Sequence, residues 1–219
     1  CRKCTSVCPV LLHTDSEEKG KEIPDIFAAW SKDERTRYYS TSGGVFSELA
    51  RKIFSMNGIV FGAVYGERQF VHHEGVEDEH GLERVRQSKY TQSNINYCFR
   101  EVKQQLMIGR SVLFCGSPCQ VAGLKWYLGK SYENLYTVDF ICRGTNSPKA
   151  YRKWLDMLEE KYHSEVKRVW FKNKELGWNR FSTRVDFKNG SVYRKDRYHD
   201  LFMKGYLEKN FYIRPSCGK

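Results

Sequence analysis

The sequence predicts an α/β protein with a mixed, largely parallel sheet, flanking helices and an α+β extension at its C-terminal end. Between Gly44 and Tyr162, short apolar stretches alternate with amphipathic stretches of helical period, which is the pattern of parallel sheets. After Ser164 the pattern changes to strand pairs. A chain of 219 residues, 40% of them hydrophobic, can bury one sizeable core of this kind.

The first predicted helix lies in the stretch GVFSELARKIFSMNG, where apolar residues recur at helical spacing. Its expected buried stripe consists of Val45, Phe46, Leu49, Ile53 and Phe54. A glycine at the end of the stretch terminates the helix. The stretch IVFGAVYG that follows is expected to be a buried strand.

The later helices are assigned from apolar residues at helical spacing, and the later strands from short apolar or alternating stretches. Helices are predicted over EHGLERVRQ, INYCFREVKQQLMIG, PCQVAGLKWYLG and SPKAYRKWLDMLEEKY, and the proline that opens the third is favourable in a first helical turn. Strands are predicted over SVLFCG, NLYTVDFIC, VKRVWFKNK, FSTRVDFKNG and SVYRKD. The last three form the predicted extension.

The first nine residues, CRKCTSVCP, carry cysteines at a spacing that is typical of iron–sulfur proteins. Cys1, Cys4, Cys8 and Pro9 match the last part of the bacterial ferredoxin run Cys-x2-Cys-x2-Cys-x3-Cys-Pro. In two-cluster ferredoxins the first two would serve one 4Fe-4S cluster and the third another. We therefore expect a fragment that begins inside the second such motif. Zinc binding and disulfide pairing remain open alternatives.

The net charge indicates the kind of binding partner, and the cysteines indicate the redox state of the compartment. The net charge of +11, most of it in residues 151–219, favours an anionic partner: nucleic acid, an acidic protein or a phosphorylated cofactor. No apolar run is long enough to span a bilayer, so a membrane span is not expected. Eight cysteines, three of them in ferredoxin spacing, indicate a reducing compartment, and we expect the cytoplasm.

Two further cysteines follow predicted parallel strands. Cys119, in FCGSPCQ, stands in the first turn of a helix, and Cys142, in DFICRG, stands at the end of the next strand. Open α/β sheets bind ligands at the carboxyl ends of their strands, so neighbouring strands would direct both sulfurs into one crevice. A helix N-terminus also favours the thiolate. Simple burial is the open alternative here, and it is our expectation for Cys98 and Cys115.

Two polar stretches are suited to an anionic cofactor. In STSGGVF, Ser42, Gly43 and Gly44 precede a helix, whose free N–H groups can hold a phosphate. An ordinary N-cap and turn is the alternative. The stretch SKYTQS adds hydroxyls, a lysine and an aromatic ring. The dinucleotide fingerprint GxGxxG is absent, which argues against a standard Rossmann site.

Several motifs in order resemble one known family. TSGGVFSELA, GIVFGAVY, RQSKYTQS, VLFCGSPCQVAGLK, LYTVDFICRGTNSP and FKNKELGW are similar to the beta-subunit family of coenzyme F420 hydrogenase/dehydrogenase, over roughly residues 40–215. The resemblance implies a flavoprotein core that binds FAD and at least one 4Fe-4S cluster. It divides the chain into a 4Fe-4S ferredoxin remnant (1–12), a linker (13–39) and a flavin and iron–sulfur oxidoreductase domain (40–219) truncated at its C-terminus.

The resemblance also implies site residues. The implied FAD contacts are Ser42, Gly43, Gly44, Ser88, Lys89, Tyr90 and Ser93, with Gly116, Ser117 and Pro118 shaping a turn beside the flavin. The implied ligands of the inner cluster are Cys119, Cys142 and Cys217, the last of which opens a Cys-x2-Cys that the sequence does not complete. The ferredoxin-type cysteines Cys1, Cys4 and Cys8 would bind the other clusters. No catalytic residue is assigned.

Two departures from the family pattern bear on these roles. Arg143 stands where relatives commonly have histidine, which puts a proton-transfer role there in doubt, and Ser117 stands where threonine is usual. Lys172, Gly177 and Trp178 match a later family pattern with looser spacing. A packed aromatic is the alternative interpretation of the tryptophan.

The implied function is an electron relay. FAD would exchange a hydride with coenzyme F420 or another small substrate, while the clusters would exchange single electrons with a protein such as ferredoxin or a partner subunit. A basic nucleic-acid-binding module is one alternative, based on the aromatics and lysines of VWFKNKELGWNRF. Nucleic acid is nevertheless not expected as a partner, because no zinc-finger, helix-turn-helix or RNA-recognition motif is present. The other alternative is a redox-silent scaffold of the same fold.

Overall fold

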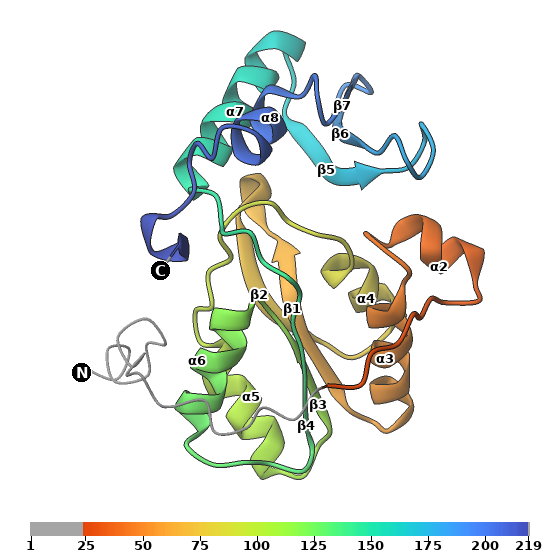
Figure 1. The fold of residues 1–219 in the computed structure, drawn as a ribbon, viewed down its shortest axis with the longest axis vertical. Helices are drawn as coiled ribbons and strands as arrows, with labels where there is room; N and C mark the ends of the chain where they lie inside the picture. Colours follow the sequence, from red (N-terminus) through yellow and green to blue (C-terminus); the bar gives the residue numbers. More distant parts are fainter. Residues whose placement is uncertain (1–23, 219) are drawn as a thin grey trace.

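A computed structural model describes residues 24–218, which form two lobes connected along the chain by residues 139–147 (Figure 1). The first lobe contains a four-stranded sheet in the order β2-β1-β3-β4. Its strands are β1 (Ile59–Tyr65), β2 (Val71–Val76), β3 (Val112–Cys115) and β4 (Leu135–Val138). Strands β1, β3 and β4 are parallel and β2 is antiparallel to β1. The predicted mixed, largely parallel sheet is therefore confirmed.

Helices cover both faces of this sheet (Figure 1). They are α3 (Val45–Ser55), α4 (Glu79–Val85), α5 (Cys98–Met107) and α6 (Pro118–Leu128). Successive side chains of β1 point to opposite faces, as the period of a strand requires. Val60 and Val64 pack in the cluster formed with α3 and α4, whereas Phe61 packs in the cluster formed with α5 and α6. The alternating apolar stretches of the sequence thus build two cores on one sheet.

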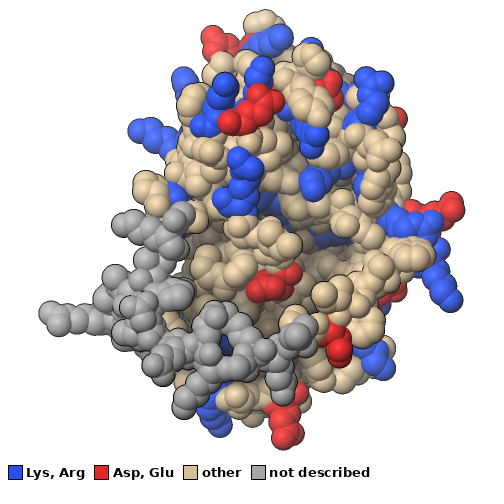
Figure 2. Space-filling view, viewed as in Figure 1, with Lys and Arg blue, Asp and Glu red and all other residues tan. Residues whose placement is uncertain are grey.

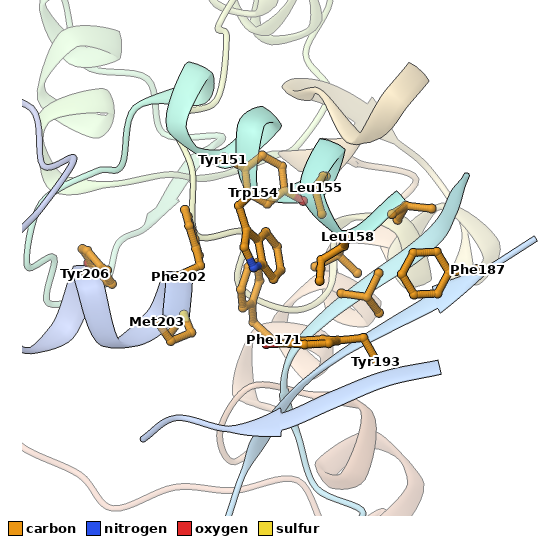
Figure 3. Packing of buried hydrophobic residues seen from close by; sticks show 13 residues of the cluster. Tyr151, Trp154, Leu155, Leu158, Phe171, Phe187, Tyr193, Phe202, Met203 and Tyr206 are labelled. Atoms are coloured by element: carbon orange, nitrogen blue, oxygen red, sulfur yellow. The ribbon is translucent and has the colours of Figure 1, made fainter. Parts of the chain in front are cut away.

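The second lobe is the predicted α+β extension. Its elements are α7 (Pro148–Tyr162), β5 (Val166–Asn173), β6 (Ser182–Phe187), β7 (Val192–Asp196) and α8 (Leu201–Leu207). The three strands form an antiparallel sheet in chain order. Figure 3 shows the aromatic core between this sheet and the two helices, in which Trp154 stacks on Phe202 with their ring centroids 4.9 Å apart.

Helix α2 (Glu34–Tyr39) fastens the N-terminal part of the described chain to the second lobe, although it lies in the segment predicted to be a linker. Tyr39 stacks on Trp170 of β5 at a centroid distance of 5.6 Å. The ammonium group of Lys174 donates to the carbonyl oxygens of Arg37 and Ser40, both at 2.6 Å. Two short 3-10 helices, η1 (Glu67–Gln69) and η2 (Pro215–Gly218), complete the fold.

Some local expectations need correction. In α3 the side chains of Val45 and Leu49 are exposed, and Ala50 joins Ile53 on the buried face instead. The strand predicted over NLYTVDFIC ends at Val138, and the residues that follow it up to Cys142 are exposed. Strand β2 and helix α8 were not expected. None of the helices within residues 24–218 has the length and apolar character to cross a membrane.

We expect Gly205→Ala to lower the free energy of unfolding by about 2 kcal/mol, because an added methyl group overpacks the site. A Cβ atom at Gly205 in α8 would lie 2.6 Å from the hydroxyl oxygen of Tyr212. Gly123→Ala in α6 is the matched control, since its nearest neighbour outside the helix backbone is a ring atom of Phe99 at 3.6 Å. There alanine should stabilise the helix by about 1 kcal/mol. Urea unfolding of both variants measures the difference, and equal effects would contradict the close contact.

Candidate functional site

The turn before α3, in the stretch STSGGVF, contacts the stretch SKYTQS, which contains Ser88. The backbone N–H of Ser88 donates to the hydroxyl oxygen of Thr41 at 2.8 Å, and the two hydroxyl oxygens are 3.1 Å apart. The side-chain amide of Gln87 donates to the carbonyl oxygen of Tyr39. Two stretches that lie more than forty residues apart in the sequence are therefore in contact, and the second of them lines a cavity together with Tyr65, the last residue of β1.

The N-terminus of α3 has the form of an anion site. Gly44 is the N-cap residue and has a φ of +88°, a left-handed conformation that favours glycine, and no side chain caps the helix. Gly43 is small for a different reason, since a Cβ atom there would lie 3.0 Å from the carbonyl oxygen of Ala29. In the same turn, the buried hydroxyl of Ser40 has no hydrogen-bond partner among the described residues. Uncapped helix amides and an unpaired hydroxyl fit a phosphate-bearing cofactor.

Lys89 supplies a cation on this surface. Its ammonium group donates to the carbonyl oxygens of Arg84, Arg86 and Gln87 at 2.9, 2.7 and 3.2 Å. Burial lowers the pKa of Lys89 to about 7. A cavity of about 160 Å³ lies beside it, and Tyr65 and Arg168 also line this cavity. The predicted cofactor lysine thus faces carbonyl groups, and an anionic ligand would favour its charged form.

Tyr90 has a packing role. Its ring contacts Phe171 and Tyr206 at centroid distances of 5.0 and 5.8 Å, and burial raises the pKa of its hydroxyl to about 12. Its carbonyl oxygen accepts a hydrogen bond from the side chain of Asn146 at 3.1 Å. Tyr90 therefore holds the segment from Ser88 to Ser93 against the second lobe.

His73, which sequence reasoning missed, fixes the end of that segment. It lies on β2, is 5% exposed, and stacks on Phe114 at a centroid distance of 5.4 Å. Its Nδ1 atom is 2.7 Å from the hydroxyl oxygen of Ser93, and its Nε2 atom is 3.1 Å from the carbonyl oxygen of Cys115. The one sequence signal was the pair of histidines in VHHEGV, a stretch that was not recognised as a strand.

The loop after β3 has the predicted form. Ser117 is the N-cap residue of α6, its N–H and hydroxyl both donate to the side-chain oxygen of Gln120 at 2.9 and 3.1 Å, and Pro118 occupies the first turn. The N–H of Gly116 donates to the carbonyl oxygen of Val138, which ties the loop to the neighbouring strand β4. Cys119 is exposed in the first turn of α6, and its sulfur is 3.2 Å from the hydroxyl oxygen of Ser117.

Cys142 and Cys217 both lie close to Gly144. The N–H of Gly144 donates to the sulfur of Cys142 at 3.4 Å, and a Cβ atom on this glycine would lie 3.2 Å from the Cβ of Cys217. Both thiols are exposed. Burial, with smaller contributions from these two cysteines, raises the pKa of Tyr206. The two sulfurs therefore face a common neighbourhood, although 75 positions separate them in the chain.

Arg143 holds this arrangement together. Its guanidinium donates to the carbonyl oxygen of Leu207 and to the side-chain oxygen of Asn210, at 2.7 and 2.8 Å. The N–H of Arg214 donates to the carbonyl oxygen of Thr145, so the backbone returns beside the segment that follows Cys142. The arginine that departs from the family pattern thus anchors the C-terminal segment.

The thiol chemistry separates the cysteines into two kinds. Burial raises the pKa of Cys115 to about 11 and that of Cys98 still further, so both remain protonated. Cys98 is buried as predicted, whereas Cys115 is half-buried. The exposed thiols are soft sulfur donors that fit an iron–sulfur cluster. Within residues 24–218, however, no three His, Cys, Asp or Glu side chains gather as a metal site, so Cys119 does not join the other two in one group. Cys1, Cys4 and Cys8 lie outside the described residues.

A hollow lies between the two lobes, and lysine and arginine side chains line it (Figure 2). Lys174, which donates to the carbonyl oxygens of Arg37 and Ser40, has its ammonium 4.0 Å from the ring centroid of Trp178 and its pKa lowered to about 8 by burial. Trp178 is 54% exposed, so it is not the packed aromatic of the alternative interpretation. Lys174 and Trp178 therefore place a positive charge beside a partly exposed ring, a pair that suits an anionic aromatic ligand.

Comparison with known proteins identifies the family and the fold. The family model for the C terminus of the coenzyme F420 hydrogenase/dehydrogenase beta subunit matches residues 109–219. Among solved structures, the chain is similar to a chain from the xenon-derivatised F420-reducing NiFe hydrogenase complex of Methanosarcina barkeri, with 16% sequence identity and a TM-score of 0.52. The similarity covers 86% of this chain and 62% of that one, and at this identity it shows a shared fold.

No protein of curated function matches the sequence. The family model nevertheless spans just over half of the chain. The chain therefore belongs to the coenzyme F420 hydrogenase/dehydrogenase beta-subunit family.

Proposed function

We propose that the chain is an FAD-dependent iron–sulfur oxidoreductase that relays electrons between 4Fe-4S clusters and a substrate that donates or accepts a hydride. The observation that carries the proposal is the convergence of the turn before α3 on the segment around Ser88, sealed by the contact between Thr41 and Ser88. The loop with Cys119 and the segment with Cys142 follow the parallel strands β3 and β4. Membership of an oxidoreductase family supports the same conclusion.

The proposed FAD site combines free backbone N–H groups at a helix N-terminus with a lysine side chain. The uncapped N-terminus of α3, preceded by Ser42, Gly43 and Gly44, would bind a phosphate. Lys89 would neutralise negative charge, and its pKa near neutrality would rise on binding. FAD supplies hydride exchange with the substrate and single-electron exchange with the clusters. The remaining proposed contacts are Ser88, Tyr90, Ser93, Gly116, Ser117 and Pro118.

The proposed cluster ligands are exposed cysteines. Cys119, in the first turn of α6, Cys142 and Cys217 would provide soft sulfur ligands for the cluster next to the flavin. The ferredoxin-type cysteines Cys1, Cys4 and Cys8 would serve the outer clusters.

The substrate and partners follow from the family and from the similar hydrogenase complex. We propose coenzyme F420 or another small redox molecule as substrate, and ferredoxin or a partner subunit as the protein that exchanges electrons. The cytoplasm is the proposed compartment.

The protein purified anaerobically is expected to show a flavin absorption band with an iron–sulfur shoulder, together with matching flavin, iron and sulfide contents. Gly44→Ala should lower the FAD affinity about tenfold, because the new side chain strains the left-handed N-cap beside the proposed phosphate site. Gly190→Ala is the matched control: Gly190 has a similar φ of +86° with nothing near its missing Cβ, so backbone strain alone should leave FAD binding unchanged.

Two outcomes would contradict the proposal. A colourless, folded wild-type protein would favour the redox-silent scaffold. Tight DNA binding that weakens steeply with salt, without flavin, would favour the nucleic-acid-binding alternative.

A further inference from the structure

The hydrogen bonds of His73 define which of its ring nitrogens carries the proton. The carbonyl oxygen of Cys115, 3.1 Å from Nε2, can only accept a hydrogen bond, so Nε2 is protonated. The ring is 5% exposed and stacks on Phe114, and burial lowers its pKa to about 4. Near neutral pH the imidazole is therefore uncharged, and Nδ1 has a lone pair and no proton.

This tautomer fixes the hydroxyl of Ser93. Because Nδ1 can only accept, the hydroxyl proton of Ser93 must point at it across the 2.7 Å contact. The oxygen of Ser93 then has lone pairs left and no proton to donate elsewhere. Ser93 is half-buried, so part of it remains accessible. A ligand at this hydroxyl must offer a hydrogen-bond donor.

The oxidised isoalloxazine ring of a flavin carries one N–H group, at N3. We propose that His73 is a positioning residue that makes Ser93 an acceptor for the N3–H group of the bound flavin. The inference rests on the proposed function, since it assigns the orientation of the cofactor in that site. It also explains why a neutral histidine links β2, the segment from Ser88 to Ser93, and the end of β3.

The test compares FAD with its N3-methyl derivative, which keeps every other group but lacks the donor. Flavin fluorescence titration of the flavin-free full chain under anaerobic conditions measures both dissociation constants. Wild type should prefer FAD about tenfold, the effect of one neutral hydrogen bond and its unpaired partner. Ser93→Ala should abolish the preference.

A matched pair of variants then separates the two hydrogen bonds of His73. The side-chain oxygen of His73→Asn takes the place of Nδ1, so this variant should keep the preference for FAD. The side-chain nitrogen of His73→Gln takes the place of Nε2 and retains the bond to Cys115 but not the acceptor for Ser93, so this variant should lose it. His80→Asn, at an exposed position of α4, is the control and should behave as wild type. Near-ultraviolet circular dichroism checks the fold of each variant.

The other outcomes separate the inference from the function on which it rests. Binding of neither flavin by wild type would overturn the proposed function. Equal binding of both flavins by wild type, or a preserved preference in His73→Gln, would overturn the role of His73 while leaving the flavoprotein intact. Loss of the preference in both histidine variants would mean that His73 holds the segment as a whole, which also contradicts the inference.

Discussion

Cys142→Ser and Cys217→Ser are each expected to abolish the inner iron–sulfur cluster while leaving flavin binding in place. The two thiols both lie close to Gly144 and are exposed, so each can act as a soft ligand without rearrangement of the core. Serine retains the size of cysteine but replaces sulfur with a hard oxygen donor, which iron–sulfur clusters do not favour. Counts of iron and sulfide per flavin, together with the visible spectrum after anaerobic purification, measure the loss.

Cys98→Ala is the matched control, because this thiol is buried in the first lobe and its pKa is raised by burial. It should keep full iron and sulfide with a small loss of stability. Full cluster content in Cys142→Ser or Cys217→Ser would contradict the proposed ligand set.

Cys119→Ser tests the remaining proposed ligand, which does not form a group of three with Cys142 and Cys217 within residues 24–218. If its thiolate is a ligand, iron and sulfide fall as in the other variants, and the loop of α6 must approach Cys142 when the cluster forms. Unchanged contents would remove Cys119 from the ligand set.

The sequence predicted the strands that are buried on both faces and the helices whose apolar residues recur at strong helical periodicity. β1 and β3 are continuous apolar runs because helices cover both faces of their sheet, and such runs are recognisable without knowledge of the fold. β2 was missed because it is an edge strand in which polar residues occupy the partly exposed positions, leaving two valines at its ends. α2 was missed because its stability comes from Tyr39 stacking on Trp170, a contact between distant parts of the chain.

In the candidate site, too, the residues in local motifs could be predicted from the sequence, and those that depend on contacts between distant segments could not. Local motifs place Cys119 and the turn before α3 correctly, since a strand-to-helix junction is a local feature. The approach of Cys217 to Gly144 depends on the C-terminal segment folding back, and Arg143 contributes to this through its bond to Leu207. His73 could not be recognised, because its role depends on partners from two other segments.

Acid is expected to destabilise the protein through His73. The pKa of this ring is lowered from 6.5 to about 4 by burial, with smaller effects of Lys89 and His72. A group whose pKa is lower in the folded state contributes stability that is fully present above its unfolded pKa and is lost as pH falls. Between 6.5 and about 4, the free energy of unfolding should therefore decrease by about 3 kcal/mol.

The histidine contribution is isolated by comparing wild type with His73→Asn, which removes the titrating ring but keeps a polar side chain. Urea unfolding of the flavin-free protein across this pH range should give a slope in wild type that is absent from the variant. Asp200 provides an opposing trend, since burial raises its pKa and its contribution grows as pH falls, but it lies in the second lobe and is unchanged by the substitution. Parallel slopes would mean that His73 takes up a proton in the folded state. A doubly protonated ring donates from both nitrogens, so His73 would then accept from Ser93 only above its ordinary pKa, and the role of Ser93 as an acceptor would be confined to that pH range.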